Sequence, residues 1–345
     1  MGKDRASNME LLRIIAMILV MIVHASVYTM NGLPRTEHVH SDVIPSLCVF
    51  FFDGLSIVCV NVFVMISGWF GIKYKLRSLV KLVFQVLFFT ILIFIVLVIY
   101  NPEEYNNLNS ISYIFLIPGP HLWFVKVYIT LMLFSPVLNY FVEYATSKQL
   151  LSVILSFFIF QTIYGWLFME ATPWIGGGYS VTSFVGLYLL ARYIRLYGLP
   201  FVNQSFLIGV MIYVGIALFH AVLAFIVTYK GIPIAGRLFT YTNPLVIIQS
   251  VALLMAFDKI EMKNKYINRI ASSVFAVYLL HGHELILRGF YGPFFVQSYR
   301  NNSFAIYLIH AIGFMTAIFV VSIAIDKIRQ CLWNLINRTC VVWEK

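Results

Sequence analysis

The chain has 345 residues, of which 61% are hydrophobic and 11% are charged. Because soluble domains carry about 25% charged residues, this composition indicates a polytopic membrane protein and excludes an ordinary soluble domain. The net charge of +10 reflects membrane topology and attraction to anionic lipids, because no basic stretch alternates with exposed aromatic residues as in nucleic-acid binders. We therefore expect the lipid bilayer as a partner and exclude nucleic acid.

The apolar stretches predict ten transmembrane helices. Each is about 20 residues long, the length that crosses a hydrocarbon core of about 30 Å. They lie at residues 9–31, 45–70, 79–100, 122–142, 149–168, 179–197, 205–228, 238–257, 270–288 and 303–325. The first is too long for a cleaved signal peptide and is interpreted as a retained span. The predicted fold class is all-α, a polytopic helix bundle, and the short loops make residues 1–345 a single transmembrane domain.

The positions of lysine and arginine predict that both termini are cytoplasmic. Positive charges near the ends of spans stay on the cytoplasmic side of a membrane. In the ten-span arrangement, all but six of the 24 lysines and arginines lie on that side. The six exceptions are Arg35, Lys126, Lys230, Arg237, Arg288 and Arg300.

The cysteines give no sign of a disulfide framework or a metal site. Cys48 and Cys59 lie in the second predicted span, and Cys331 and Cys340 lie in the cytoplasmic tail. None has the C-x-x-C spacing that zinc sites and redox motifs use, so we expect no metal.

The segment LLRIIAMILVMIVHA, residues 11–25, carries two ionisable side chains within the first span. A charge at the centre of a bilayer costs about 2.5–3.5 kcal/mol on insertion scales, so such residues usually face the interior of the bundle and have a function. Arg13 and His24 are eleven residues apart, which is three turns plus about 20° and a rise of about 16 Å, so they share one helix face. Imidazole is the side chain best suited to move a proton near neutral pH. The alternatives are a snorkelling anchor for Arg13 and a helix–helix hydrogen bond for His24.

Two further groups of charges lie near the second and third spans. Asp53 is about two turns into the second span, at a depth comparable to that of His24. It could orient the imidazole, as in other His–Asp pairs, or be an end charge that reaches the surface. The segment GIKYKLRSLVK, residues 71–81, brings four positive charges to the cytoplasmic start of the third span. They fit the topology and could also hold the phosphates of a nucleotide-bearing substrate.

Four motifs in chain order resemble the acyltransferase 3 family of integral membrane acyltransferases. They are NMELLRIIAMILVMIVHA (8–25), VNVFVMISGWF (60–70), HLWFVKVYITLMLFSPVL (121–138) and SSVFAVYLLHG (272–282). The resemblance implies transfer of an acyl group, most often acetyl from acetyl-CoA, to a hydroxyl of a carbohydrate, typically a cell-surface or lipid-linked glycan. It implies acetyl-CoA as a co-substrate without a further cofactor. It also implies a multi-pass protein of the bacterial inner (plasma) membrane.

The resemblance also implies roles for individual residues. The family's catalytic histidine and its required arginine, in an R-x10-H pattern, correspond to His24 and Arg13. The basic residues that follow the S-G motif in the family are associated with the acyl donor, and the corresponding residues here are Arg77 and Lys81 and, less closely, Lys73 and Lys75. The candidate acceptor-binding residues are His121, Trp123, Tyr128 and His281. Structural alternatives stay open: an interfacial anchor for Trp123, a helix cap for His121, an outer-face position for His281 and His283, and helix packing for Asn61, Ser67 and Gly68.

The sequence departs from the family pattern at the fourth span. Larger members carry a W-x4-E-E motif there, whereas Lys126 and Tyr128 occupy this region. Because the span supplies no acid, either Asp53 is the third candidate catalytic residue beside His24 and Arg13, or the mechanism needs no acid partner. The alternative from another class is a transporter or flippase for a glycan or small solute. Its expected signs are broken helices in corresponding positions and an inverted repeat, which the sequence does not show clearly.

Overall fold

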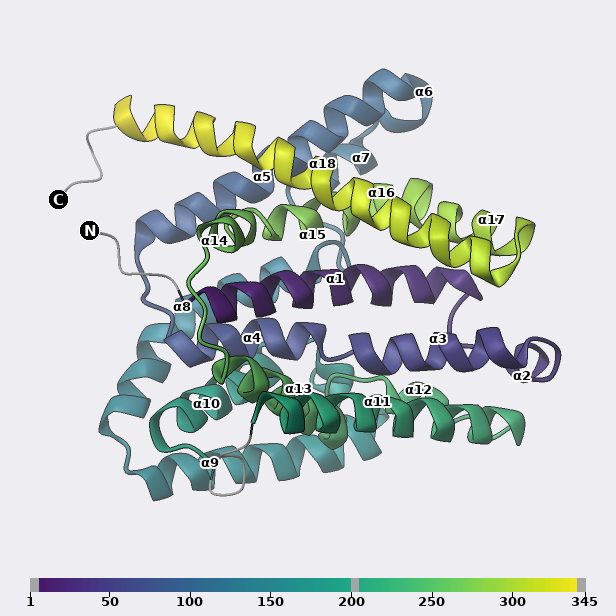
Figure 1. Cartoon of the computed structure of the whole chain (residues 1–345). Coiled ribbons are helices and arrows are strands. Elements are labelled where there is room, and N and C mark those ends of the chain that lie inside the picture. The colour runs from purple at the N-terminus through teal and green to yellow at the C-terminus, as the bar shows by residue number, and fades with distance from the viewer. Residues whose placement is uncertain (1–5, 200–204, 340–345) are drawn as a thin grey trace.

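The computed structural model describes residues 6–199 and 205–339. Within these ranges the chain is helical without a strand, and the helices pack into one bundle (Figure 1), which confirms the predicted all-α class. The α-helices are α1 Ser7–Thr29, α2 Thr36–Ser41, α3 Val43–Ser56, α4 Cys59–Phe70, α5 Leu76–Tyr100, α6 Pro102–Tyr105, α7 Leu108–Ile114, α8 Trp123–Tyr144, α9 Ser147–Phe160, α10 Val181–Tyr197, α11 Phe206–Tyr229, α12 Ala235–Leu238, α13 Pro244–Asp258, α14 Lys265–Ala271, α15 Phe275–His281, α16 Glu284–Ile286, α17 Gly292–Asn301 and α18 Phe304–Thr339.

Seven helical segments of the described chain are long and apolar enough to cross a membrane. They are Ser7–Thr29, Val43–Phe70, Leu76–Tyr100, Trp123–Tyr144, Ser147–Leu167, Phe206–Tyr229 and Phe304–Asn337. An eighth candidate is a pair of segments, Lys265–His281 and Glu284–Asn301, that is bent by 63°.

The other two predicted spans are shorter than expected. Helix α10 has 17 residues and α13 has 15, which at 1.5 Å per residue gives about 25 Å and 22 Å. The reason lies at their N-termini. The side chains of Ser180 and Asn243 accept backbone N–H groups of the first turn and start these helices after the apolar stretch has begun.

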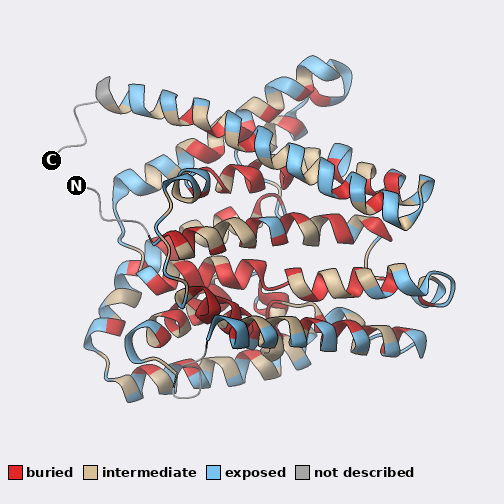
Figure 2. Ribbon diagram, in the orientation of Figure 1, coloured by how far each residue is buried: buried red, intermediate tan, exposed pale blue. Residues whose placement is uncertain are grey.

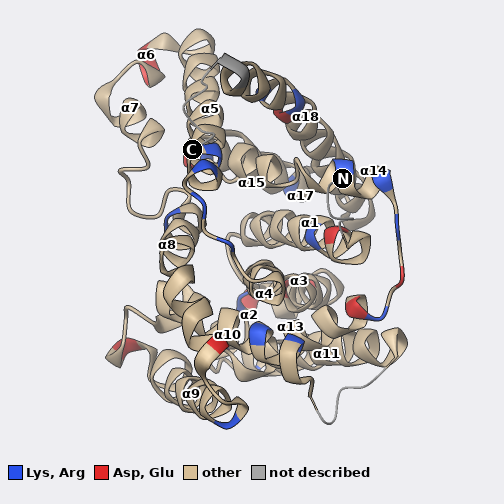
Figure 3. Ribbon diagram, turned by 90° about the vertical axis from the view of Figure 1, so that its left-hand side faces the viewer, with Lys and Arg blue, Asp and Glu red and all other residues tan. Residues whose placement is uncertain are grey.

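Helix α1 begins and α18 ends at the same end of the bundle (Figure 1). Figure 3 views this end directly and shows lysines and arginines on several of its helix ends. Its assignment to the cytoplasm remains a prediction. Four of the charges behind that prediction, Lys3, Arg5, Arg338 and Lys345, lie outside the residues whose side chains are described.

The centre of the bundle is formed by α1, α3 and α4, where buried residues concentrate (Figure 2). Two glycines let neighbouring helices approach closely. A Cβ atom on Gly68 of α4 would lie 2.6 Å from the Tyr188 carbonyl oxygen of α10. A Cβ atom on Gly54 of α3 would lie 2.8 Å from the Ala217 carbonyl oxygen of α11. Close approach at small residues is how membrane helices gain packing energy, so the packing role considered for Gly68 agrees with the structure.

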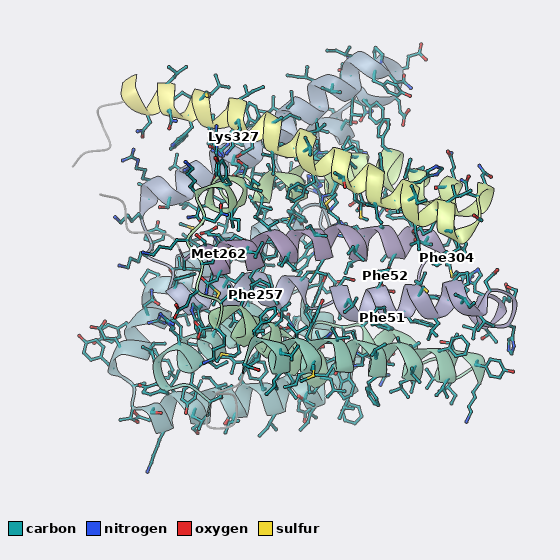
Figure 4. The ribbon with its side chains drawn as sticks, viewed as in Figure 1. Phe51, Phe52, Phe257, Met262, Phe304 and Lys327 are labelled. Atoms are coloured by element: carbon teal, nitrogen blue, oxygen red, sulfur yellow. The ribbon has the colours of Figure 1, made fainter. Side chains whose placement is uncertain are left out.

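Helix α18 lies across α5 and α14 and is held by a buried polar network. Asp326 Oδ1 accepts hydrogen bonds from Arg329 Nη2 at 2.7 Å and from Gln85 Nε2 of α5 at 3.0 Å. Arg329 is only 1% exposed. Lys327, labelled in Figure 4, donates from Nζ to the Arg269 carbonyl oxygen of α14 at 3.1 Å. These contacts fix α18 against α5 and against α14, the first helix of the bent pair.

Candidate active site

One stripe of α1 borders a cavity between the helices. Met17, Val20 and His24 are among the residues that line it. Their spacing of three and four residues is that of one helix face. Arg13 precedes Met17 by four residues in the same unbroken helix, so it lies one turn beyond the cavity on the same face. Arg13 and His24 therefore lie on the same face of α1, as the spacing predicts.

The walls opposite α1 are mainly aromatic. The complete lining comes from α1, α4, the start of α8, the segment before α13, and α15. The lining residues are Met17, Val20, Val23, His24, Cys59, Val60, Phe63, Trp123, Phe124, Tyr241, Phe275 and Tyr278. Of these lining residues, His24, Tyr241, Tyr278, Trp123 and Cys59 carry polar groups. His24 is the one that can act as a general base near neutral pH.

His24 presents only one ring nitrogen to the cavity. Its Nδ1 atom is buried and has no hydrogen-bond partner. The ring itself is part of the cavity wall, which leaves Nε2 as the nitrogen that can meet a substrate. The nearest imidazole is that of His281, with 5.1 Å between the ring centroids.

The structure gives Asp53 a different partner from His24. Asp53 is 7% exposed, and its Oδ1 atom accepts a hydrogen bond from the Ser26 hydroxyl. Ser26 follows His24 by two residues, so their side chains point about 200° apart around α1. Asp53 therefore lies on the side of α1 that faces away from the cavity, and it is absent from the lining of that cavity. The rotation of α1 therefore separates the two groups.

His281 and His283 lie at the break of the bent pair and are 0% and 1% exposed. Both side chains are therefore enclosed by protein, whichever side of the membrane this break lies on. A break in a helix at membrane depth is tolerated where protein buries it. His121, also fully buried, supports this break, because its Nδ1 atom accepts the backbone N–H of Glu284 at 3.3 Å.

His121 is held neutral by its surroundings. Burial, with a smaller contribution from the charge of Lys126, lowers the pKa of His121 to about 4. The neutral ring can accept at Nδ1, as its bond to Glu284 requires. The cap considered for His121 is thus present, but it caps α16 instead of α8.

The candidate acceptor-binding residues separate into two groups. Trp123 lines the cavity, with its ring 6.2 Å from that of Tyr241. The other three, His121, Tyr128 and His281, are not among the lining residues. The Tyr128 hydroxyl instead bonds Ser67 Oγ at 3.1 Å, so direct contact with an acceptor is not supported for these three.

Arg13 has an acidic neighbour that sequence reasoning missed. Its Nη1 atom lies 2.6 Å from Glu10 Oε2, and Glu10 is 7% exposed. The i,i+3 spacing in one helix was the available signal. Because Arg has five donors, this pair orients the guanidinium and leaves further N–H groups for another anion.

The four candidate donor-binding residues lie beyond the cavity at the end of the bundle where α1 begins. They are exposed side chains of the link between α4 and α5 and of the first turns of α5: Lys73, Lys75, Arg77 and Lys81. Lys73 also lines a surface hollow together with Arg192 of α10. Arg192 was not singled out from the sequence, and its Nε atom is buried without a partner.

Three further cavity residues were missed: Cys59, Tyr241 and Tyr278. Tyr278 lies inside the motif SSVFAVYLLHG, but no spacing rule distinguishes it from its neighbours. Cys59 begins α4 and Tyr241 precedes α13, so only the packing of these elements brings them to His24.

Comparison with known proteins gives one match. The model of the acyltransferase 3 family, described as an acyltransferase domain, matches residues 7–327. Searches of curated proteins and of solved structures give no match. The family match covers nearly the whole chain, including α1, α4 and the bent pair. The chain therefore belongs to the acyltransferase 3 family of membrane acyltransferases.

Proposed function

We propose that the protein is a membrane O-acyltransferase that moves an acetyl or other short acyl group from acyl-CoA to a hydroxyl of a cell-surface carbohydrate or glycoconjugate. The observation that carries the proposal is the place of His24. Its imidazole borders an aromatic cavity, on the same face of α1 as Arg13. The bacterial inner membrane and acetyl-CoA as co-substrate are part of this proposal.

In the proposed reaction His24 is the general base. Its Nε2 atom takes the proton of the acceptor hydroxyl while the hydroxyl oxygen attacks the thioester carbonyl. The C–S bond then breaks, and the imidazolium returns the proton to the leaving CoA thiolate. Free CoA-SH and the O-acyl ester are the products, and His24 ends neutral.

A covalent route uses the same residue. Nε2 attacks the thioester and forms acyl-histidine with loss of CoA, and the acceptor hydroxyl then attacks this intermediate. The two routes differ in kinetics, because only the second releases CoA in the absence of an acceptor hydroxyl.

The donor is proposed to enter from the end of the bundle that carries the exposed basic residues. Lys73, Lys75, Arg77 and Lys81 would hold the nucleotide phosphates through charge-assisted hydrogen bonds. Helix α4 supports this direction, because Phe63 lines the cavity and Lys73 follows the end of the same helix. From Phe63 to the last residue of α4 the rise is about 10 Å, a length that the extended pantetheine arm can cross.

The acceptor is proposed to bind against the aromatic walls. The rings of Trp123 and Tyr241 offer flat faces for the apolar side of a sugar ring, and the hydroxyl of Tyr278 can bond a sugar oxygen. Asp53 has no place in this mechanism, because it does not reach the cavity.

The experiment is label transfer by the purified, membrane-reconstituted protein. It is given radiolabelled acetyl-CoA and a panel of glycans, and the label in each glycan is measured for the wild type, His24→Ala and Arg13→Gln. We expect transfer to one glycan class that falls about 10²–10⁴-fold in His24→Ala, the usual contribution of a general base. Full transfer by His24→Ala would refute the assignment of His24.

The transporter alternative has one observation in its favour. Residues Lys265–Asn301 form a bent pair of the kind that transporters use at a substrate site. However, its break is sealed, since His281 and His283 are buried and neither lines the cavity. In vesicles, translocation of an unmodified glycan without label transfer would support the transporter instead.

A further inference from the structure

His281 has a fixed tautomer and an unused lone pair. Its Nδ1 atom lies 2.5 Å from the carbonyl oxygen of Val277, four residues earlier in α15. A carbonyl oxygen only accepts, so Nδ1 carries the proton and Nε2 of the neutral ring is an acceptor. This Nε2 atom is buried and has no hydrogen-bond partner. Most buried polar atoms are paired, so an unpaired one needs an explanation.

His24 offers the complementary group. Its Nδ1 atom is also buried and without a partner, and its ring centroid is 5.1 Å from that of His281. Two imidazoles at this separation can be joined by an N–H···N bond of about 3 Å once the nitrogens face each other. The rings are inclined by 54°. The His24 ring has no hydrogen bond at Nδ1, and a histidine ring has a broad last torsion, so it is this ring that turns to face His281.

The neighbouring tyrosines do not satisfy His281. The Tyr291 ring lies 5.2 Å from it, but the Tyr291 hydroxyl donates to the Met21 carbonyl oxygen at 2.8 Å. The Tyr278 ring lies 6.4 Å away, and its hydroxyl interacts with the backbone of Phe124. Among these close aromatic neighbours, His24 is the one whose polar atom is still unpaired.

We propose that His281 is a positioning residue for His24, with its Nε2 atom accepting the Nδ1–H of His24. This inference rests on the proposed function of His24 as the reacting imidazole. The bond keeps the proton of neutral His24 on Nδ1 and so directs the Nε2 lone pair into the cavity. It takes the place that a carboxylate holds in Ser-His-Asp triads, while the Val277 carbonyl oxygen fixes His281 in turn.

The bond also acts during the reaction. When Nε2 of His24 takes the hydroxyl proton, the ring becomes an imidazolium with two N–H groups. Nδ1–H stays bonded to His281, and Nε2–H is delivered to the leaving thiolate. His281 gains and loses no proton in the cycle, so it positions His24 without being a second base.

The test compares substitutions of His281 that keep or remove an acceptor. Gln places its amide oxygen near the position of Nε2. Asn keeps a group near Nδ1 that can bond Val277, but does not reach His24. Met has the length of Gln without its acceptor. We expect His281→Gln to keep kcat within about tenfold of the wild type, and His281→Asn and His281→Met to lower kcat about 10²-fold or more, with unchanged KM for acetyl-CoA and acceptor.

The matched control is His220→Asn. His220 is buried in α11, contacts Asn243 at 3.3 Å and does not line the cavity, so its replacement reports the effect of losing a buried histidine elsewhere. Thermal unfolding is measured for every variant, and kinetics are compared among folded ones. If His281→Asn does not fold, the Gln and Met variants carry the comparison.

Equal kcat for the Gln and Met variants would overturn the inference, whether both are active or both are impaired. A second comparison uses a His24→Ala background, where His281→Met should produce no further loss, because residues that act as a unit are not additive. An equal loss in both backgrounds would also overturn it. Absence of label transfer by the wild type would refute the proposed function itself, and full transfer by His24→Ala would refute the assignment of His24. Both results are obtained without the His281 series.

Discussion

Asp53→Asn tests which group orients the catalytic imidazole. If Asp53 acted on His24 as the aspartate does in catalytic triads, the substitution would lower kcat about 10⁴-fold. The structure instead bonds Asp53 to Ser26, on the side of α1 that faces away from the cavity. Asn still accepts the Ser26 hydroxyl, so we expect kcat to stay within about tenfold of the wild type, the size of a change transmitted through packing alone.

The same geometry predicts that Ser26→Ala lowers the free energy of unfolding more than Asp53→Asn does. Ser26→Ala removes the hydroxyl that bonds the buried carboxyl, and an unpaired buried acceptor costs about 1–3 kcal/mol in the free energy of unfolding. Asp53→Asn keeps the bond and should cost less. Thermal unfolding of both variants in the same detergent or nanodisc gives the ranking.

The activity assay is transfer of radiolabelled acetyl from acetyl-CoA at saturating donor, with His24→Ala as the inactive reference. A loss in Asp53→Asn as large as that in His24→Ala, with normal thermal unfolding, would refute the separation of the two groups across α1. It would also weaken the positioning role of His281, because a carboxylate would then occupy that role.

Three other expectations follow from close packing, from the cavity and from the buried ion pair. Gly68→Ala places a Cβ atom 2.6 Å from a carbonyl oxygen of α10 and should lower the free energy of unfolding by about 1–3 kcal/mol. Gly215→Ala is the control, because its Cβ atom would meet nothing within 4 Å, and it should not lower the free energy of unfolding. Cys59 lines the cavity, so in a protein whose other cysteines are replaced by Ser, labelling of Cys59 with a small thiol reagent should abolish acyl transfer. Acetyl-CoA should slow this labelling. Full labelling with unchanged activity would contradict the place of Cys59 in the cavity wall. Asp326→Asn leaves buried Arg329 without its carboxylate. It should lower the free energy of unfolding by about 3–5 kcal/mol, far more than Lys327→Ala at the partly buried neighbouring position.

The sequence was sufficient for features that depend on local geometry. Long apolar stretches with few charges determine membrane helices, because backbone groups in lipid must bond within their own segment. The period of the α-helix places Arg13 and His24 on one face, since eleven residues complete three turns in any straight helix. Four short motifs also sufficed for the family, which the match over residues 7–327 confirms.

The tertiary structure decided which groups meet across helices. Asp53 and His281 were both candidates from the sequence, and both lie on other elements than His24. Packing turned Asp53 to Ser26 on the far side of α1 and brought His281 to 5.1 Å from His24. The bend after α15 and the caps that shorten α10 and α13 were likewise hidden within continuous apolar stretches. Composition reports how much of a helix is apolar, whereas the rotation of each helix and the point where it breaks depend on contacts between residues far apart in the chain.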